Sequence, residues 1–313
     1  MDAAVSVGQG TLGEVRISIV IPVYNVERYL ARCLDSVLAA ARGRDCEIIC
    51  VNDGSTDGSA AILEHYADRV RILAKANGGL GSARNAGLDI LTGDYVMFVD
   101  SDDWIPEWAI ARFAAVAEAS NAALVVSTSF SGDVPPAKPS SAVRWALRPS
   151  PWIAGRRVQY CAWNKLYRAD LFRTRRYPAT IYEDFPVTTD ILCEVGEFAA
   201  IDEPLYVYCT NANAASLVRS AFTERKLRDS VSVVRMVLET ARRQEDPRLA
   251  RFAFRQASDG HSSTIGQICK AKDLELAKLF LELHSALVAD FPRLTRGLTF
   301  KAGFRLWKLR GWI

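Results

Sequence analysis

The stretch ISIVIPVYN at residues 17–25 decides the fold. Its first seven residues form a continuous, mainly β-branched run, which is typical of a strand that is covered on both faces. Apolar residues with helical spacing follow from Val26 to Ala41, and Asn25 is the expected N-cap of this helix. A strand that leads directly into a helix indicates a βαβ unit and therefore a parallel sheet.

The same alternation continues outward from this stretch. Further strands are expected at residues 47–51, 70–74, 94–99 and 123–128, with helices at 57–67, 81–91 and 106–119. The sequence therefore predicts an α/β fold with a mostly parallel sheet flanked by helices. Residues 131–151 contain five prolines and predict a long loop. From about Ala221 onward only helices are expected.

This pattern divides the chain of 313 residues into three parts. Residues 1–15 are expected to be a flexible N-terminus. Residues 16–215 form the predicted α/β domain, in which the proline-rich stretch separates a first half at 16–130 from a second half at 152–215. Residues 216–313 form the predicted helical C-terminal region.

Composition excludes several classes of protein. The net charge of +3 gives no argument for a nucleic-acid partner. No apolar run approaches the roughly 18 residues that a membrane span needs, and the N-terminus has no apolar core typical of a secretory signal. Seven scattered cysteines without a C-x-x-C pair indicate reduced thiols, so a cytoplasmic location is expected.

Polar clusters follow four of the predicted strands. In an open α/β sheet, ligands bind beyond the carboxyl ends of the strands, so these clusters are expected to converge. A carboxylate can accept hydrogen bonds from a base or a ribose, glycines allow close approach of a phosphate to a helix N-terminus, and paired carboxylates suit Mg²⁺ or Mn²⁺. Ordinary turn chemistry is the competing explanation for each cluster taken alone. The residues concerned are Pro22, Tyr24, Asn25, Asp53, Asp57, Gly79, Arg84, Asp100 and Asp102.

Four segments carry a specific resemblance: ISIVIPVYNVERYLARCLDSV, VNDGSTDGS, NGGLGSARNAGL and GDYVMFVDSDD. They resemble the successive motifs of the family 2 glycosyltransferases, which have the GT-A fold. The resemblance is specific over residues 17–110, looser through residue 208, and lapses after about Ser220. It implies transfer of a sugar from a nucleotide-activated donor, usually UDP-linked, with inversion at the anomeric carbon.

The resemblance also implies roles for the residues at the strand ends. Pro22, Tyr24 and Asn25 would border the nucleoside, and Asp53 would face the base. Asp57 and Arg84 would support the donor, with Gly79 in the same donor-binding set. Asp100 would lie near the ribose, and Asp102 would be the main ligand of Mn²⁺ or Mg²⁺, with Asp100 beside it.

Inverting transfer needs a carboxylate that takes the proton of the acceptor hydroxyl. Glu183 and Asp184 match the acidic pair of the family, in which the Asp usually acts as the base; a helix start that favours acids is the structural alternative. Trp163 and Lys165 are candidates for the acceptor pocket. The alternative is that they are only a buried Trp beside a surface Lys. His261 is a candidate third metal ligand, whereas His65 and His284 are expected at the surface.

The predicted function is therefore transfer of a single sugar from a nucleoside-diphosphate donor to a hydroxyl of a glycan or lipid-linked saccharide. Bacterial cell-surface polysaccharide synthesis is expected from family analogy alone. The Q-x-x-R-W motif of processive members is missing, because Gln159 leads to Cys161-Ala162-Trp163. The alternatives are a catalytically silent nucleotide-sugar-binding protein and a nucleotidyltransferase.

The C-terminal residues 297–313, GLTFKAGFRLWKLRGWI, combine aromatic and basic side chains at helical spacing. Such a helix can lie in an anionic membrane interface, which predicts peripheral contact with the inner face of the cell membrane. The alternative is that its aromatics pack on the core of the protein or on a second subunit, which would make the C-terminal helices an oligomer interface.

Overall fold

A computed structural model describes residues 14–132, 145–149, 160–209, 221–297 and 300–312. The chain divides into two compact units. The first unit comprises Met1–Ala179 with Glu197–Asn213, and the second comprises Thr180–Gly196 with Ala214–Ile313. The expected flexible N-terminus lies outside the described residues, except for its last two positions.

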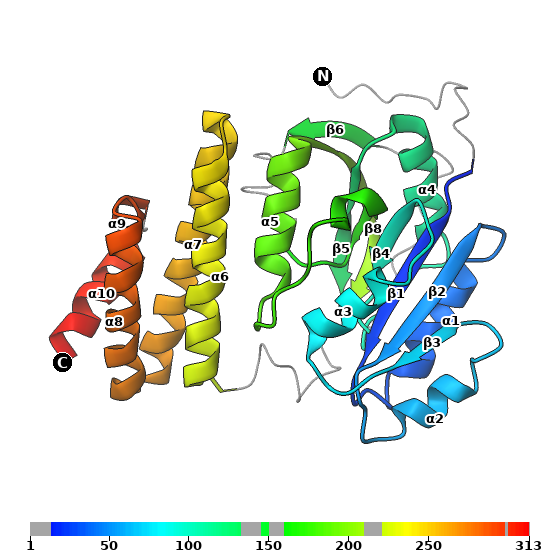
Figure 1. Cartoon of the computed structure of the whole chain (residues 1–313), viewed down its shortest axis with the longest axis horizontal. Helices are drawn as coiled ribbons and strands as arrows, with labels where there is room; N and C mark the ends of the chain where they lie inside the picture. Colours follow the sequence, from blue (N-terminus) through cyan, green and yellow to red (C-terminus); the bar gives the residue numbers. More distant parts are fainter. Residues whose placement is uncertain (1–13, 133–144, 150–159, 210–220, 298–299, 313) are drawn as a thin grey trace. The chain divides into compact units, whose positions relative to one another are not determined.

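The first unit is built on an eight-stranded sheet in the order β3-β2-β1-β4-β7-β5-β8-β6 (Figure 1). β1 is paired in parallel with β2 and β4, whereas β7 runs antiparallel to both β4 and β5, so the sheet is mixed. The strands are β1 (Ile17–Val23), β2 (Cys46–Asn52), β3 (Arg71–Ala74), β4 (Tyr95–Phe98), β5 (Leu124–Ser131), β6 (Trp145–Pro149), β7 (Lys165–Arg168) and β8 (Glu197–Tyr208).

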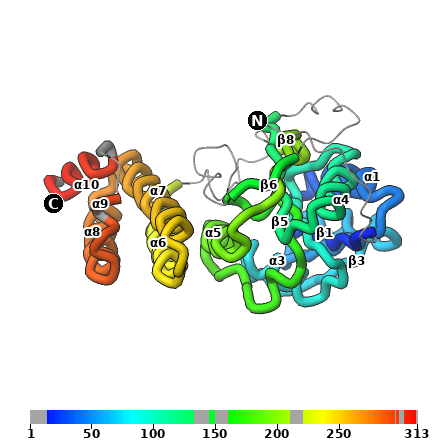
Figure 2. Tube along the Cα trace, turned by 90° about the horizontal axis from the view of Figure 1, so that it is seen from above, coloured from blue at the N-terminus to red at the C-terminus, as the bar shows by residue number. Residues whose placement is uncertain are grey.

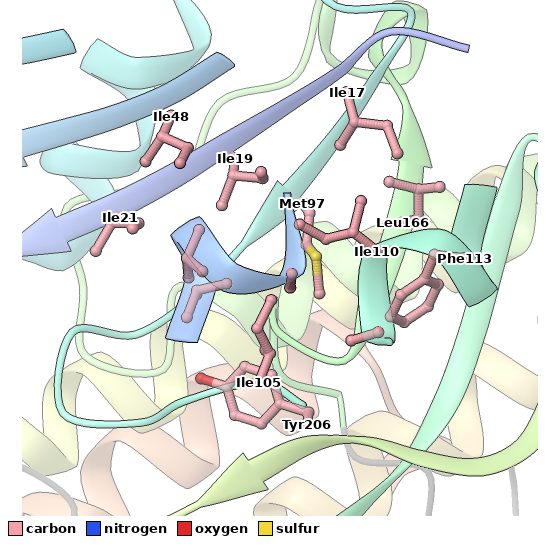
Figure 3. Packing of buried hydrophobic residues seen from close by; sticks show 14 of the residues in the cluster. Ile17, Ile19, Ile21, Ile48, Met97, Ile105, Ile110, Phe113, Leu166 and Tyr206 are labelled. Carbon is pink, nitrogen blue, oxygen red and sulfur yellow. The ribbon is translucent and has the colours of Figure 1, made fainter. Parts of the chain in front are cut away.

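Helices cover both faces of this sheet, as the apolar run at residues 17–23 predicts. The side chains of Ile17, Ile19 and Ile21 share one core cluster with α1 (Leu30–Ala40) and α4 (Ala109–Ser120) (Figure 3). α3 (Leu80–Leu88) lies against the opposite face, where Gly87 passes so close to Val20 that an added Cβ would overlap the Val20 side chain. The remaining helices of this unit are α2 (Ser59–Glu64) and the 3₁₀ helix Ala169–Phe172.

Two local predictions in this unit were wrong. The helix after β1 begins at Leu30, and Asn25 is not its N-cap, because the backbone of Asn25 is left-handed (φ 51°) and its side chain bonds the next loop instead. The proline-rich segment also contains a strand, since β6 pairs antiparallel with β8. That pairing depends on a partner about fifty residues further along the chain, which a local pattern does not reveal.

The second unit is helical, which confirms the predicted C-terminal helices. Residues 180–196, which we expected within the α/β part, group with it because α5 packs against α6 and α7. α10 in turn contacts α7 and α8, and Figure 2 shows α6 and α7 side by side. The helices are α5 (Asp184–Val195), α6 (Glu224–Arg243), α7 (Pro247–Ala271), α8 (Leu274–Asp290), α9 (Leu294–Gly297) and α10 (Phe300–Trp312).

A pair of buried histidines lies between α7 and α8. Nε2 of His261 is 2.9 Å from Nδ1 of His284, and the two rings stack with their centroids 5.1 Å apart. The prediction that His284 is a surface residue was wrong, because this face of α8 packs on α7; His65 is exposed as predicted. His261 is enclosed with His284 and Phe280, so its Nε2 is already engaged within the helical core.

No helix in the described parts of the chain combines the length and the apolar character that crossing a bilayer requires.

Candidate functional site

The loops after β1 and β2 are tied together by Asn25. Its Oδ1 accepts a hydrogen bond from the backbone amide of Thr56 (2.8 Å), and the backbone amide of Asn25 donates to Oγ of Ser55 (3.3 Å). Tyr24, next to it, is 47% exposed, whereas Pro22 is buried within β1. The first two predicted clusters therefore do converge at the carboxyl edge of the sheet, with the Tyr24 ring open to solvent.

Asp53 organises the glycine-rich loop that precedes α3. Its carboxylate accepts hydrogen bonds from the amides of Gly78 (3.0 Å) and Gly79 (2.8 Å) and pairs with Nζ of Lys75 at 2.5 Å. We expected the glycines of this loop to let a phosphate approach the helix N-terminus, where amide groups and the helix dipole favour an anion. In the structure the Asp53 carboxylate holds the two loop amides that directly precede the helix, which begins at Leu80.

The backbone at Gly79 explains why a glycine is needed in this loop. Its φ is +87°, a region that residues other than glycine rarely adopt, and its amide donates the shorter of two hydrogen bonds to Oδ2 of Asp53. A side chain at this position would strain the turn and move the amide from Asp53.

Asp57 holds the start of α2 against the loop after β1. Its carboxylate accepts hydrogen bonds from the amides of Glu27 (3.0 Å) and Ser59 (2.9 Å), while Oε2 of Glu27 accepts one from the amide of Gly58 (2.7 Å). Burial alone raises the pKa of Asp57, but the hydrogen bonds from Ser59 and Glu27 outweigh it and lower the pKa below its ordinary value. The charged Asp57 carboxylate therefore connects the loop after β1 to the start of α2.

Arg84 connects α3 to the end of β4. Its guanidinium is almost fully buried and donates to Oδ1 of Asp100 at 2.8 Å, and it packs against the rings of Tyr177 and Phe98. Asp100 remains partly exposed, with 22% of its side chain accessible. A buried Arg whose fork grips one carboxylate oxygen fixes the orientation of that carboxylate.

The loop at residues 100–104 is anchored to β8. Oδ2 of Asp103 accepts a hydrogen bond from the hydroxyl of Tyr206 (2.7 Å), and its Oδ1 accepts one from the amide of Cys209 (2.8 Å). Backbone hydrogen bonds between Trp104 and Val207 add an isolated bridge to the same strand. Asp103 is thus a structural anchor, and it holds Asp102 in position beside Asp100.

The three carboxylates at this strand end repel one another. Burial, followed by the charge of Asp100, raises the pKa of Asp102 to about 6. Burial and the charges of Asp102 and Asp100 raise the pKa of Asp103 to about 8. A cation bound here would offset this repulsion, because an opposite charge favours the ionised form of each group.

A family model described as Glycosyl transferase family 2 matches residues 18–186, which is more than half of the chain. The chain belongs to this family. It is 34% identical over 215 residues to a protein named uncharacterized glycosyltransferase EpsJ, from Bacillus subtilis, and the match covers 63% of this chain and 62% of EpsJ. The matched region thus spans less than two thirds of that relative.

Solved structures show the same GT-A fold. Residues 1–349 of S. aureus TarS, in complex with UDP, superpose with a TM-score of 0.73 at 18% identity, over 95% of this chain and 87% of that one. Glucosyl-3-phosphoglycerate synthase of Mycobacterium tuberculosis, in complex with Mn²⁺, UDP and glucosyl-3-phosphoglycerate, gives a TM-score of 0.50 at 18% identity over 72% of this chain and 80% of that one.

Trp163 and Lys165, the candidates for the acceptor pocket, are both buried. Trp163 is buried and stacks on Tyr206 with the ring centroids 4.5 Å apart. Lys165, which we expected at the surface if it had no role in the site, is fully buried, and its Nζ donates to the carbonyl of Cys161 and to Oδ1 of Asn164, both at 2.8 Å. The Nζ group is thereby directed toward the 161–164 turn.

The acidic pair belongs to the second unit. Asp184 is the first residue of α5 and Glu183 is its N-cap. The preceding Tyr182 has a left-handed backbone (φ 66°), which is uncommon for a residue other than glycine and strains the entry to this helix. Asp184 also lies in the first turn of the helix, where the dipole stabilises a negative charge.

Sequence reasoning missed Lys75, Arg32 and Tyr206. Lys75 directly follows β3, so the rule that located the other polar clusters also finds it. Arg32 lies on α1 and donates to the backbone carbonyl of Asp102 (3.3 Å), and Tyr206 reaches the loop from β8. These two contacts join elements far apart in the chain, and no local signal indicates them.

A divalent cation fits this site only together with a second source of oxygen ligands. Within the described residues, no three His, Cys, Asp or Glu side chains are grouped so as to hold a metal ion. Asp102 and Asp100 supply hard carboxylate oxygens, and a nucleoside diphosphate supplies the phosphate oxygens that such an ion also accepts. The residues present therefore suit an ion that binds with the donor.

Proposed function

We propose that this glycosyltransferase transfers one sugar from a nucleoside-diphosphate donor, most simply a UDP-sugar, to a hydroxyl of a glycan or lipid-linked saccharide, with inversion at the anomeric carbon. The observation that carries the proposal is the convergence of Asp53, the Arg84–Asp100 pair and Asp102 at the carboxyl edge of the sheet in a GT-A fold. The complexes of TarS with UDP and of the mycobacterial synthase with UDP and Mn²⁺ support the choice of donor.

Donor binding would use the loops that Asn25, Asp53 and Asp57 hold together. Tyr24 presents an exposed ring beside the predicted nucleoside position. A carboxylate has about four acceptor positions, and those of Asp53 already receive Nζ of Lys75, the amide of Gly78 at both oxygens, and the amide of Gly79. Contact between Asp53 and a base N–H would therefore replace a bond to the 25% exposed side chain of Lys75, while the glycine amides stay in place.

Departure of the nucleoside diphosphate would depend on Asp102, with Asp100 beside it, as the ligands of Mn²⁺ or Mg²⁺. When bound, such an ion supplies charge stabilisation for the leaving diphosphate. Arg84 would act as a positioning residue, because it orients Asp100 and does not itself reach the open side of the cluster.

Proton transfer would fall to the acidic pair. The acceptor oxygen attacks the anomeric carbon, the bond from that carbon to the β-phosphate oxygen breaks, and the hydroxyl proton passes to Asp184, with Glu183 as its neighbour. The left-handed Tyr182 supports a functional constraint at this position, since backbone strain clusters at active sites.

The test uses the full chain and a panel of UDP-, GDP- and dTDP-sugars with Mn²⁺ or EDTA. We expect one UDP-sugar to raise the melting temperature in Mn²⁺ and not in EDTA, because a ligand that binds only the native state stabilises it. Asp102→Asn should remove that shift. Asp45→Asn, at an exposed carboxylate on the amino edge of the same sheet, is the matched control and should retain it.

Release of UDP from the selected donor, with and without saccharide acceptors, then separates the candidates. Acceptor-stimulated UDP release supports transfer. Donor binding without release by any acceptor indicates the silent binding protein. Pyrophosphate release from UTP and a sugar 1-phosphate indicates the nucleotidyltransferase.

A further inference from the structure

α10 presents two opposite faces within the second unit. Ala302, Leu306 and Leu309 are buried and belong to the core cluster of this unit. Phe304 and Trp307 point the other way, with exposed fractions of 50% and 68%, and their rings stack with the centroids 5.8 Å apart. The aliphatic face of the helix therefore anchors it to the protein, and the aromatic face is presented to solvent.

Basic side chains surround this aromatic pair. Nζ of Lys308 lies 5.1 Å from the centroid of the Phe304 ring, and Arg310 is exposed on the other flank. Residues 293–313 contain six Lys or Arg and no Asp or Glu, whereas the rest of the chain has 33 basic and 36 acidic residues. The positive charge of the protein is thus concentrated around Trp307, the most exposed of the tryptophans whose side chains the structure describes.

We propose that the outer face of α10 docks on the surface of an anionic lipid bilayer. Aromatic rings favour the interfacial region of a membrane, where their apolar faces leave water, and flanking Lys and Arg side chains reach lipid phosphates. The arrangement is that of a helix lying in the plane of the membrane, attached to its protein by the opposite face.

A second copy of the chain is the less favourable occupant of this face. A two-fold symmetric contact would place the same patch of both copies together, so Lys308 and Arg310 would face another set of cations without acidic partners on α10. Charge complementarity therefore favours a negatively charged surface.

The experiment is co-sedimentation of the full chain with phosphatidylglycerol–phosphatidylcholine vesicles and with pure phosphatidylcholine vesicles. We expect binding to the anionic vesicles at low salt, with at least a tenfold loss on pure phosphatidylcholine. We expect vesicle binding to weaken at least tenfold in each of two double variants, Phe304→Ser/Trp307→Ser and Lys308→Glu/Arg310→Glu. Each basic residue near the membrane surface contributes a factor of about five to the membrane affinity. Leu274→Ser, at an exposed apolar residue of α8, is the matched control and should bind as wild type.

Circular dichroism and size-exclusion chromatography of each variant complete the test. Because both variants change exposed side chains, their spectra and melting temperatures should equal those of wild type. Equal binding of wild type and Phe304→Ser/Trp307→Ser to anionic vesicles overturns the proposal. The proposal is also overturned if wild type forms a dimer that does not bind vesicles and that dissociates in Phe304→Ser/Trp307→Ser. In that case a second copy of the chain occupies this face.

Discussion

The buried pair His261–His284 predicts that the helical unit loses stability in mild acid. Burial, together with the charge of His284, lowers the pKa of His261 from 6.5 to about 3 in the folded protein. The unfolded chain binds a proton at this site below pH 6.5, whereas the folded chain stays neutral until about pH 3. Because the unfolded state binds more protons in that window, stability is fully present above pH 6.5 and falls as the pH falls.

The size of the effect follows from this difference. Each pH unit below 6.5 costs about 1.4 kcal/mol, so moving from pH 7.5 to pH 5 removes about 2 kcal/mol. For a unit of this size, that loss corresponds to a decrease of about 8 °C in the melting temperature.

The assay is thermal unfolding followed by circular dichroism at both pH values, with hydrogen exchange of α7 and α8 peptides to locate the loss. His261→Phe keeps an aromatic ring beside Phe280 and removes the titrating group, so most of the pH-dependent decrease should vanish, whatever fixed cost the change has at pH 7.5. His65→Gln, at an exposed residue, should retain the wild-type decrease. An equal decrease in wild type and His261→Phe would refute this reasoning.

Three further changes test the proposed site. Asp102→Ala should abolish Mn²⁺-dependent transfer while the melting temperature without ligand stays near that of wild type; full activity would exclude Asp102 as a ligand. Asp184→Asn should lower turnover by about 10²–10⁴ with little change in donor affinity, and a larger loss in Glu183→Gln would exchange the two roles. Arg84→Met should lower the free energy of unfolding, measured in urea, by about 3 kcal/mol, because Asp100 loses its buried partner. Arg84→Lys keeps the positive charge and should recover part of that loss. Equal free energies of unfolding for Arg84→Met and Arg84→Lys would mean that the ion pair does not stabilise the fold.

Local sequence patterns determined the α/β alternation and the carboxyl edge where the polar clusters meet. The β1 prediction matched the structure at both ends, because a strand that is covered on both faces shows as an uninterrupted apolar run. The clusters containing Asp53, Arg84 and Asp100 were located in the same way, since a parallel sheet carries the ends of its strands to one edge. The family resemblance then supplied their roles.

Tertiary packing decided the contacts of these residues. Asp53 bonds the amides before α3, Asp103 bonds Tyr206 of β8, and Lys165 is buried, and each of these arrangements depends on which elements the folded chain brings together. The same holds for His284, whose helical spacing indicates an amphipathic helix but not which partner covers its face. Sequence periodicity reports the repeat of one element, whereas burial and hydrogen bonding depend on the neighbouring element, which is often far away along the chain.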